Sequence, residues 1–368
     1  MANPTNVQDD DTDYSSQDMD IDGVSDDAAS ESSRPISYDI SSYGGDYTID
    51  GLVQRLKKGA FYTPTFQRSY VWSLRQASTF IESLLLGLPV PAVFVYKEED
   101  TGNHLIIDGQ QRLKTLQYFF AGVFKEKVFR LVDVQERWKG KTYLELSESD
   151  RQKLDDSLIH VIIFKQNSPT NDRSSVYHVF RRINTGGIRL QPQEIRNCVY
   201  PGALNTLLKE LNKNISWRAI YGAENPRMKD QELILRFFAL NYELDKYERP
   251  MADFLNGFSD RFRNPSVETK EKFNYLFRNT IALIFSELGA GAFRPEKLLN
   301  AAVFDGVMIG VARRLELGPI KSSGGIKERY EELIKDDGFR SAYLRSTADV
   351  ESVRSRIKIA SEYFKSVA

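Results

Sequence analysis

The sequence has 368 residues, 41% of them hydrophobic, which is ordinary for a soluble globular protein long enough for two domains. The formal net charge of -1 hides an asymmetry: residues 1–33 hold ten acidic and no basic residues, and subtracting them from 51 acidic residues leaves 41 against 50 basic ones, or about +9. One cysteine and three histidines exclude a disulfide framework and a structural zinc site, and no apolar run approaches membrane-spanning length.

The same inventory favours a cytoplasmic protein. A single cysteine is typical of a reducing compartment, and the start, Met1-Ala2-Asn3-Pro4 followed by acidic residues, lacks the basic and apolar regions of a signal peptide. Cys198 lies on an apolar helical face, which favours a core position over a nucleophile. The basic excess after residue 33 fits a polyanionic partner such as DNA, although ordinary surface charge explains it equally well.

The first expected elements are an acidic tail and two helices. Residues 1–35 are rich in Asp and Ser and are expected to be disordered. This tail either keeps the protein soluble or competes with nucleic acid for the basic remainder. A short helix is predicted from Ile49 to Leu56. An amphipathic helix is predicted from Leu74 to Leu86, which Gly87 and the following prolines end.

Strands and a further helix follow. Ala92 to Tyr96 is apolar on both faces, which predicts a central strand, and a charged turn joins it to a second strand that ends at Asp108. Two more strands are expected at Phe129 to Val134 and at Leu158 to Phe164. Apolar residues at helical spacing then predict a helix from Val176 to Ile183.

The rest of the chain has a helical pattern. Pro192 suits the first position of a short helix, and from Gly202 onward apolar residues recur at helical spacing. The expected fold class is therefore α+β. Its parts are an acidic tail over residues 1–35, a small mixed sheet with helices over 36–200, and an all-α domain over 201–368.

One stretch between a strand and a helix carries the clearest chemistry. Gly109 follows Asp108 and permits a tight turn with close backbone approach. The helix that starts there presents unpaired N–H groups, and its dipole favours anions. Side-chain donors and positive charge around this point come from Gln110, Gln111, Arg112 and Lys114. The pattern predicts a phosphate cradle, but taken alone it favours an ordinary helix start with exposed polar residues.

Two further segments could supply ligand contacts. Gln67 and Arg68, in an extended segment with Trp72, offer a planar guanidinium and a stacking ring, unless the aromatic residues are core and Arg68 pairs with an acid. Asn184 and Thr185, in a turn with two glycines, and Glu194 in the next helix could face the same ligand. The alternatives there are turn chemistry for Asn184 and a surface salt bridge between Glu194 and Arg196.

Several common enzyme motifs are missing from the sequence. It has no P-loop, no dinucleotide-binding Gly-x-Gly-x-x-Gly, no His-Glu-x-x-His zinc site and no Gly-x-Ser-x-Gly nucleophile elbow. A His-dependent nuclease site is not indicated either. His104 begins a strand, His160 lies in a predicted buried strand, and His178 sits in the middle of a helix.

Four blocks, in order, resemble a known family. They are Phe66-Gln67-Arg68-Ser69-Tyr70-Val71-Trp72, Ser83-Leu84-Leu85-Leu86-Gly87-Leu88-Pro89-Val90-Pro91, Ile107-Asp108-Gly109-Gln110-Gln111-Arg112-Leu113, and Phe180-Arg181-Arg182-Ile183-Asn184-Thr185-Gly186-Gly187 with Leu190 and Glu194-Ile195-Arg196. As a set they are similar to the ParB/sulfiredoxin-like domain at the N-terminus of GmrSD-type modification-dependent restriction endonucleases. The similarity covers roughly residues 45–215.

The resemblance implies a ParB-like mixed sheet with helices, in which Asp-Gly-Gln-Gln-Arg is the signature loop. Applied to phosphoryl transfer, it suggests catalytic roles for Asp108, Arg112 and Arg68, with Asp108 either holding Mg²⁺ or orienting water. Contacts to phosphate or nucleotide fall to Gln67, Gly109, Gln110, Gln111, Lys114, Asn184, Thr185 and Glu194. Full-length relatives usually add a His-Asn-His-type nuclease domain. This chain departs from that pattern, because its second half is helical and lacks the histidines.

Three hypotheses follow. The first is a module that binds and hydrolyses a nucleoside triphosphate within a DNA restriction or anti-phage defence system. The second is a Mg²⁺-dependent nuclease that uses the same loop, and the third is a non-enzymatic DNA-binding or regulatory module. A single carboxylate at the loop is fewer than most two-metal nucleases supply, which favours nucleotide handling. DNA, a separate nuclease subunit and a second copy of the chain are the compatible partners, and no membrane is expected.

Overall fold

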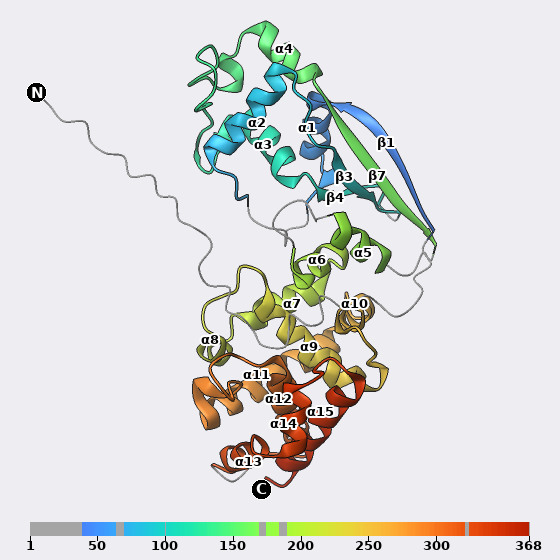
Figure 1. Ribbon diagram of the computed structural model, residues 1–368, viewed down its shortest axis with the longest axis vertical. Helices are drawn as coiled ribbons and strands as arrows, with labels where there is room; N and C mark the ends of the chain where they lie inside the picture. Colours follow the sequence, from blue (N-terminus) through green and yellow to red (C-terminus); the bar gives the residue numbers. More distant parts are fainter. Residues whose placement is uncertain are drawn as a thin grey trace, which may run out of the picture.

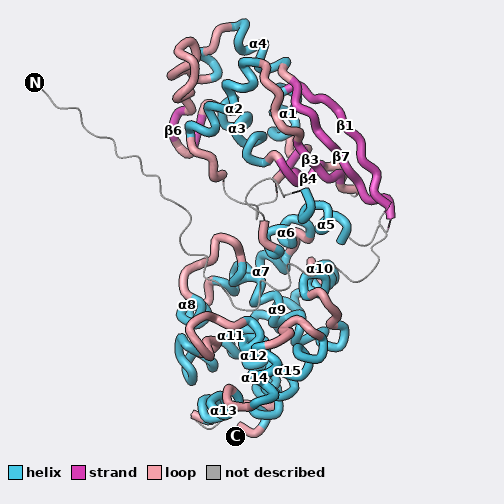
Figure 2. Tube along the Cα trace, in the orientation of Figure 1, coloured by secondary structure: helices cyan, strands magenta, loops and turns pink. Residues whose placement is uncertain are grey.

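The computed structural model describes residues 39–63, 70–99, 101–168, 174–183, 190–320 and 324–367. The chain is a mixed α+β protein, as expected (Figure 1). A part built on a small sheet comes first and a part built only from helices follows, and the two occupy opposite ends of the molecule (Figure 2). The predicted acidic tail lies outside the described residues, and the expected domain limits stay a prediction.

The sheet has five strands in the order β1-β7-β3-β4-β2. β3 and β4 form an antiparallel hairpin, β3 also pairs with β7 in parallel, and β1 runs antiparallel along the whole of β7. The strands are β1 (Asp39–Thr48), β2 (Phe61–Tyr62), β3 (Val93–Lys97), β4 (His104–Asp108) and β7 (Leu158–Ser168). The prediction that the strand near Ala92 to Tyr96 is central is confirmed.

Helices cover both faces of the sheet, which explains why its central strands are apolar on both sides. Along β4, Ile106 packs into the core on one face, whereas Leu105 and Ile107 pack into the core on the other. The first face carries α1 (Ile49–Lys57), α2 (Leu74–Leu86), α3 (Gln110–Ala121) and α4 (Glu148–Asp156). The second carries α5 (Ser174–Ile183) and α6 (Pro192–Val199).

Strong local signals explain why α2 has its predicted bounds. Ser73 and Gln76 form a reciprocal capping box at its start. Gly87 ends the helix in the left-handed region, with φ 76°, and its N–H donates to the carbonyl of Leu84. The apolar stripe Ala77, Ile81, Leu84 and Leu85 is buried, as expected.

The predicted strand at Phe129 to Val134 is wrong. This segment is an irregular loop, preceded by a two-residue hairpin of β5 (Val123–Phe124) and β6 (Lys127–Val128). Phe129 and Leu131 are buried in the core beneath the helices, but their backbone does not enter the sheet. Leu131 instead exchanges backbone hydrogen bonds with the nearby loop, and the next N–H donates to Ser78 of α2. The prediction failed because buried apolar residues in a loop give the same sequence pattern as a buried strand.

The sequence analysis also missed β1 and α4. β1 is an edge strand with a polar, glycine-containing sequence, so it lacks the apolar alternation of a buried strand. A Cβ atom on Gly44 would lie 2.6 Å from Nε2 of His160 on β7, so a larger residue there would have to displace the imidazole ring. α4 buries only Leu154, which is too little for a periodic signal.

The helical part has a single large apolar core that confirms the predicted stripes. Its helices are α7 (Ala203–Asn212), α8 (Ile215–Tyr221), α9 (Lys229–Glu243), α10 (Met251–Arg261), α11 (Val267–Leu288), α12 (Ala301–Glu316), α13 (Gly325–Leu333), α14 (Asp337–Leu344) and α15 (Val350–Lys365). Turns of 3₁₀ helix lie at Tyr143–Glu145, Leu244–Lys246 and Gly289–Gly291. No helix within the described ranges is both long and apolar enough to cross a membrane.

α12 is buried along most of its length and packs closely on α15. A Cβ atom on Gly310 would lie 2.9 Å from the carbonyl oxygen of Ala360, so the two backbones approach where glycine leaves room. Asp305 of α12 is fully buried and accepts hydrogen bonds from two guanidiniums. Arg236 of α9 donates to both carboxylate oxygens at 2.7 and 2.8 Å, and Nη2 of Arg356 on α15 donates to Oδ2 at 2.6 Å.

Candidate functional site

The turn between β4 and α3 has the tight geometry expected for a phosphate cradle. Gly109 is the N-cap residue of α3, and its φ of 94° lies in the left-handed region. A Cβ atom there would lie 2.8 Å from Cγ2 of Val93 on β3. Gly109 has no side chain to cap the first N–H groups of α3, as Ser or Asp would do. The position therefore needs glycine for two reasons and leaves the helix start open to an anion.

Gly109→Ala should destabilise the protein by about 2 kcal/mol, because the left-handed conformation and the clash with Val93 each carry a cost. The midpoint of urea unfolding measures this change. Gly87→Ala is the matched control: its φ is also positive, but a Cβ atom there meets nothing within 4 Å, so it should cost less. Equal losses for the two variants would contradict the close approach at Gly109.

Asp108 and Arg112 are paired across the turn. Nη2 of Arg112 donates to Oδ2 of Asp108 at 2.7 Å, and Nη1 donates to the carbonyl of Pro91, just before β3. The Arg112 side chain is 11% exposed and that of Asp108 is 39% exposed. Burial lowers the pKa of Arg112, and the charge of Asp108 opposes that shift. Arg112 therefore fixes the orientation of Asp108 and ties it to the adjacent strand.

Gln111 uses its side-chain carbonyl to hold the segment before α2. Its Oε1 accepts hydrogen bonds from the backbone N–H groups of Val71 at 3.0 Å and Trp72 at 3.3 Å. One turn later, the hydroxyl of Thr115 lies 2.7 Å from that of Tyr70, which is buried. Burial raises the pKa of Tyr70 to about 12. Tyr70 is therefore held against α3, and the expectation that this tyrosine is a core residue is confirmed.

Lys114 lies one helical turn after Gln110 on α3 and is half-buried. Burial lowers the pKa of its ammonium group. Within the described residues it has no hydrogen bond or ion pair. A partly desolvated ammonium without a carboxylate partner is a suitable contact for a phosphate oxygen.

Glu194 is placed differently from the sequence expectation. It is buried, and its Oε2 accepts hydrogen bonds from the N–H of Gln191 at 2.6 Å and from Nε of Arg227 at 3.0 Å. The alternative of a surface salt bridge with Arg196 is wrong, because Arg196 is buried as well and pairs with Glu232 of α9. The contact of Glu194 with a ligand stays a prediction.

The polar residues of α6 connect the sheet to the helical part. Nε of Arg196 donates to Oδ1 of Asn256 on α10 at 3.0 Å, and Nη1 lies 3.2 Å from Oε2 of Glu232. Sequence reasoning missed both partners and Arg227, because they lie more than 30 positions away and no local pattern marks them. Cys198, on the same helix, is buried and confirms the expectation of a core cysteine.

Several predicted site residues lie outside the described residues. They are Gln67, Arg68, Asn184 and Thr185. The contacts assigned to them therefore stay predictions. Gln110 is described as the first residue of α3, and its contact with phosphate likewise stays a prediction.

The described residues contain no group of three or more His, Cys, Asp and Glu side chains that could hold a metal ion. The expectation of a buried His160 is wrong: it lies on β7, but its side chain is half exposed, with Nδ1 2.7 Å from Oδ1 of Asp46. Asp108 keeps Oδ1 without a hydrogen bond among the described residues. One carboxylate oxygen fits Mg²⁺ when phosphates and water supply most of its ligands.

The geometry agrees with what comparison with known proteins finds. Residues 49–201 match the family model described as the GmrSD restriction endonuclease, N-terminal domain. The matched range runs from the start of α1 to just after α6, so it contains the β4–α3 turn and both helices on the second face of the sheet. No curated protein matches the chain. Residues 49–201 are thus similar to the N-terminal domain of GmrSD restriction endonucleases, and this similarity suggests a module of a restriction or defence system.

Proposed function

We propose that the β4–α3 turn binds the phosphates of a nucleoside triphosphate and hydrolyses it, as part of a restriction or defence system that acts on DNA. One observation carries this proposal: α3 begins at Gly109 without a side-chain cap, next to Asp108, which is paired with Arg112. Lys114 lies on the same helix, with the pKa of its ammonium group lowered by burial. An open helix start with a cation one turn away favours an anion, and a fixed carboxylate at its edge can act on water or a metal ion. The family match to a restriction endonuclease domain supports the proposed setting.

Each residue then has a defined task. Backbone N–H groups after Gly109 hold phosphate oxygens, and Lys114 neutralises part of their charge. Asp108 holds Mg²⁺ or orients the attacking water, and Arg112 keeps its carboxylate in place. When bound, Mg²⁺ would supply charge neutralisation for the transferred phosphoryl group. Arg68 would neutralise part of the negative charge that develops on the transferred phosphoryl group.

The deciding experiment is phosphate release from ATP, GTP, CTP and UTP with Mg²⁺, with and without DNA. Turnover of one or more of these nucleotides by the full chain would support the proposal. Binding without turnover would leave a nucleotide-sensing regulator, and no turnover under any condition would contradict hydrolysis. Mg²⁺-dependent nicking of DNA without nucleotide, abolished by Asp108→Ala, would instead favour direct phosphodiester cleavage by the same loop.

Lys114→Ala should weaken nucleotide binding about 10-fold, because one charge-assisted contact to phosphate contributes about 1.5 kcal/mol. Titration of a fluorescent nucleotide measures the change. Lys57→Ala, at the exposed end of α1, removes the same charge and serves as the control. Equal affinities of the Lys114→Ala variant and the wild type would remove Lys114 from the site.

A further inference from the structure

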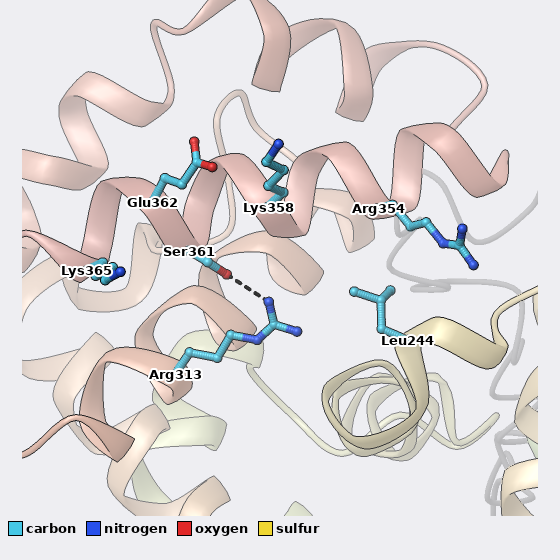
Figure 3. Close-up of a pocket in the computed structure, with 7 residues that line it drawn as sticks. All are labelled: Leu244, Arg313, Arg354, Lys358, Ser361, Glu362 and Lys365. Atoms are coloured by element: carbon cyan, nitrogen blue, oxygen red, sulfur yellow. Dashed lines mark hydrogen bonds between the residues drawn. The ribbon is translucent and has the colours of Figure 1, made fainter.

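The helical part carries a surface groove with an excess of positive charge (Figure 3). It encloses about 270 Å³ and lies where α15 passes the end of α12 and the turn that follows α9. We call it the basic groove, and its charged lining residues are Arg313, Arg354, Lys358, Lys365 and Glu362. Leu244 and Ser361 complete the lining. The lining therefore holds four cations and one carboxylate, and Figure 3 shows Lys358 and Glu362 pointing away from Leu244 and Arg313.

Three of these cations form a stripe along α15. Arg354, Lys358 and Lys365 stand at positions i, i+4 and i+11, so they share one face of the helix, and all three are exposed. At 1.5 Å per residue the stripe spans about 17 Å. The opposite face of α15 is buried through Val353 and Ile357. The helix is therefore anchored by its apolar side, and on its solvent face the three cations outnumber the two exposed carboxylates, Glu351 and Glu362.

The hydrogen bonds recorded for these cations go to neutral acceptors. Arg313 donates to the hydroxyl of Ser361 at 3.2 Å, and Arg354 donates to the backbone carbonyl of Asp245 at 3.1 Å. None of the four cations has an ion pair with any residue that the structure describes. Some exposed cations elsewhere on the helical part do, as Lys272 does with Glu268 at 2.7 Å. The groove differs in gathering four such cations around one place. The basic groove thus keeps its positive potential available to a partner.

We infer that the basic groove binds the phosphodiester backbone of duplex DNA. Duplex DNA carries one negative charge per about 1.7 Å of axis, so a 17 Å stripe faces several phosphates at once, which a single small anion cannot match. Arg and Lys side chains on a helix face suit contacts to phosphates, which position a protein on DNA without reading its bases. The groove lies beyond residues 49–201, so it adds a DNA-holding surface to the helical part and does not depend on nucleotide hydrolysis.

Fluorescence anisotropy with a labelled 24-bp duplex, without nucleotide and over a series of NaCl concentrations, tests this inference on the full chain. The triple variant Arg354→Ala/Lys358→Ala/Lys365→Ala should bind at least about 10-fold more weakly at low salt. It should also lower the slope of log K against log[NaCl] by about 3, one for each lost contact. Glu362→Gln removes the carboxylate from the groove and should change affinity in the opposite direction.

The matched control is Lys209→Ala/Lys327→Ala/Lys335→Ala, which removes the same charge from exposed positions outside the groove. It should keep the wild-type slope. Equal weakening by both triple variants would show a general charge effect and overturn the inference, as would wild-type binding by the groove variant or no DNA binding by the wild type. Phosphate release without DNA reports separately on the nucleotide site, so the two proposals fail independently.

Discussion

Arg112→Ala should lower the rate of nucleotide hydrolysis by a factor of about 100, with a smaller effect on nucleotide binding. Its guanidinium is already engaged by Asp108 and by the carbonyl of Pro91, and it is mostly buried. It therefore acts chiefly by orienting Asp108, rather than by reaching the ligand itself. Loss of orientation affects the step in which Asp108 takes part more than the ground-state complex. Single-turnover phosphate release and nucleotide titration separate the two effects.

A double-mutant cycle with Asp108→Asn distinguishes this role from direct contact with the transition state. If Arg112 acts through Asp108, the double variant should be no slower than the slower single variant. If the rate losses of the two single variants multiply in the double variant, the guanidinium contacts the reacting phosphate independently of Asp108. Arg112→Lys keeps the charge but loses the fork that joins Asp108 to Pro91, so it should recover little activity. Unchanged hydrolysis in a folded Arg112→Ala variant would remove Arg112 from the mechanism.

The β4–α3 turn could be predicted because its causes are local in sequence. An apolar run that ends at Asp108, a glycine that permits a positive φ, and a helical stripe from Leu113 define strand, turn and helix without distant information. The same holds for α2, with its capping box and its glycine stop. In both places, neighbouring residues specify the backbone conformation that the fold uses.

The partners inside the site could not be predicted, because they meet only through the tertiary fold. Gln111 was expected to contact phosphate, yet its carbonyl accepts from backbone groups about 40 residues earlier. Glu194 was expected near a ligand or on the surface, yet it is buried against Arg227. The sequence does not show whether a polar residue at a helix start contacts a ligand or makes a buried structural hydrogen bond. The sequence could predict which residues lie near the β4–α3 turn, but not which group each of them contacts.

Asp305→Asn should destabilise the helical part by about 3–5 kcal/mol, because it removes the buried negative charge that two buried guanidiniums share. Arg236 and Arg356 both donate to Asp305, and burial lowers the pKa of Arg356, a shift that the charge of Asp305 opposes. Urea unfolding followed by far-UV circular dichroism measures the loss. Glu268→Gln, which breaks the exposed pair with Lys272, should leave the midpoint unchanged.

A triple variant of the same cluster tests why Asp305→Asn loses stability. Replacing all three residues, as Asp305→Leu/Arg236→Met/Arg356→Met, removes the stranded charges together and should recover most of the stability lost in Asp305→Asn. Recovery would show that the cost lies in unpaired buried charge rather than in the shape of the side chain at this position. The cluster joins α9, α12 and α15, and α12 and α15 also carry the cations of the basic groove. Asp305→Asn should therefore weaken DNA binding near its unfolding midpoint, whereas the charge-free triple variant should bind DNA like the wild type.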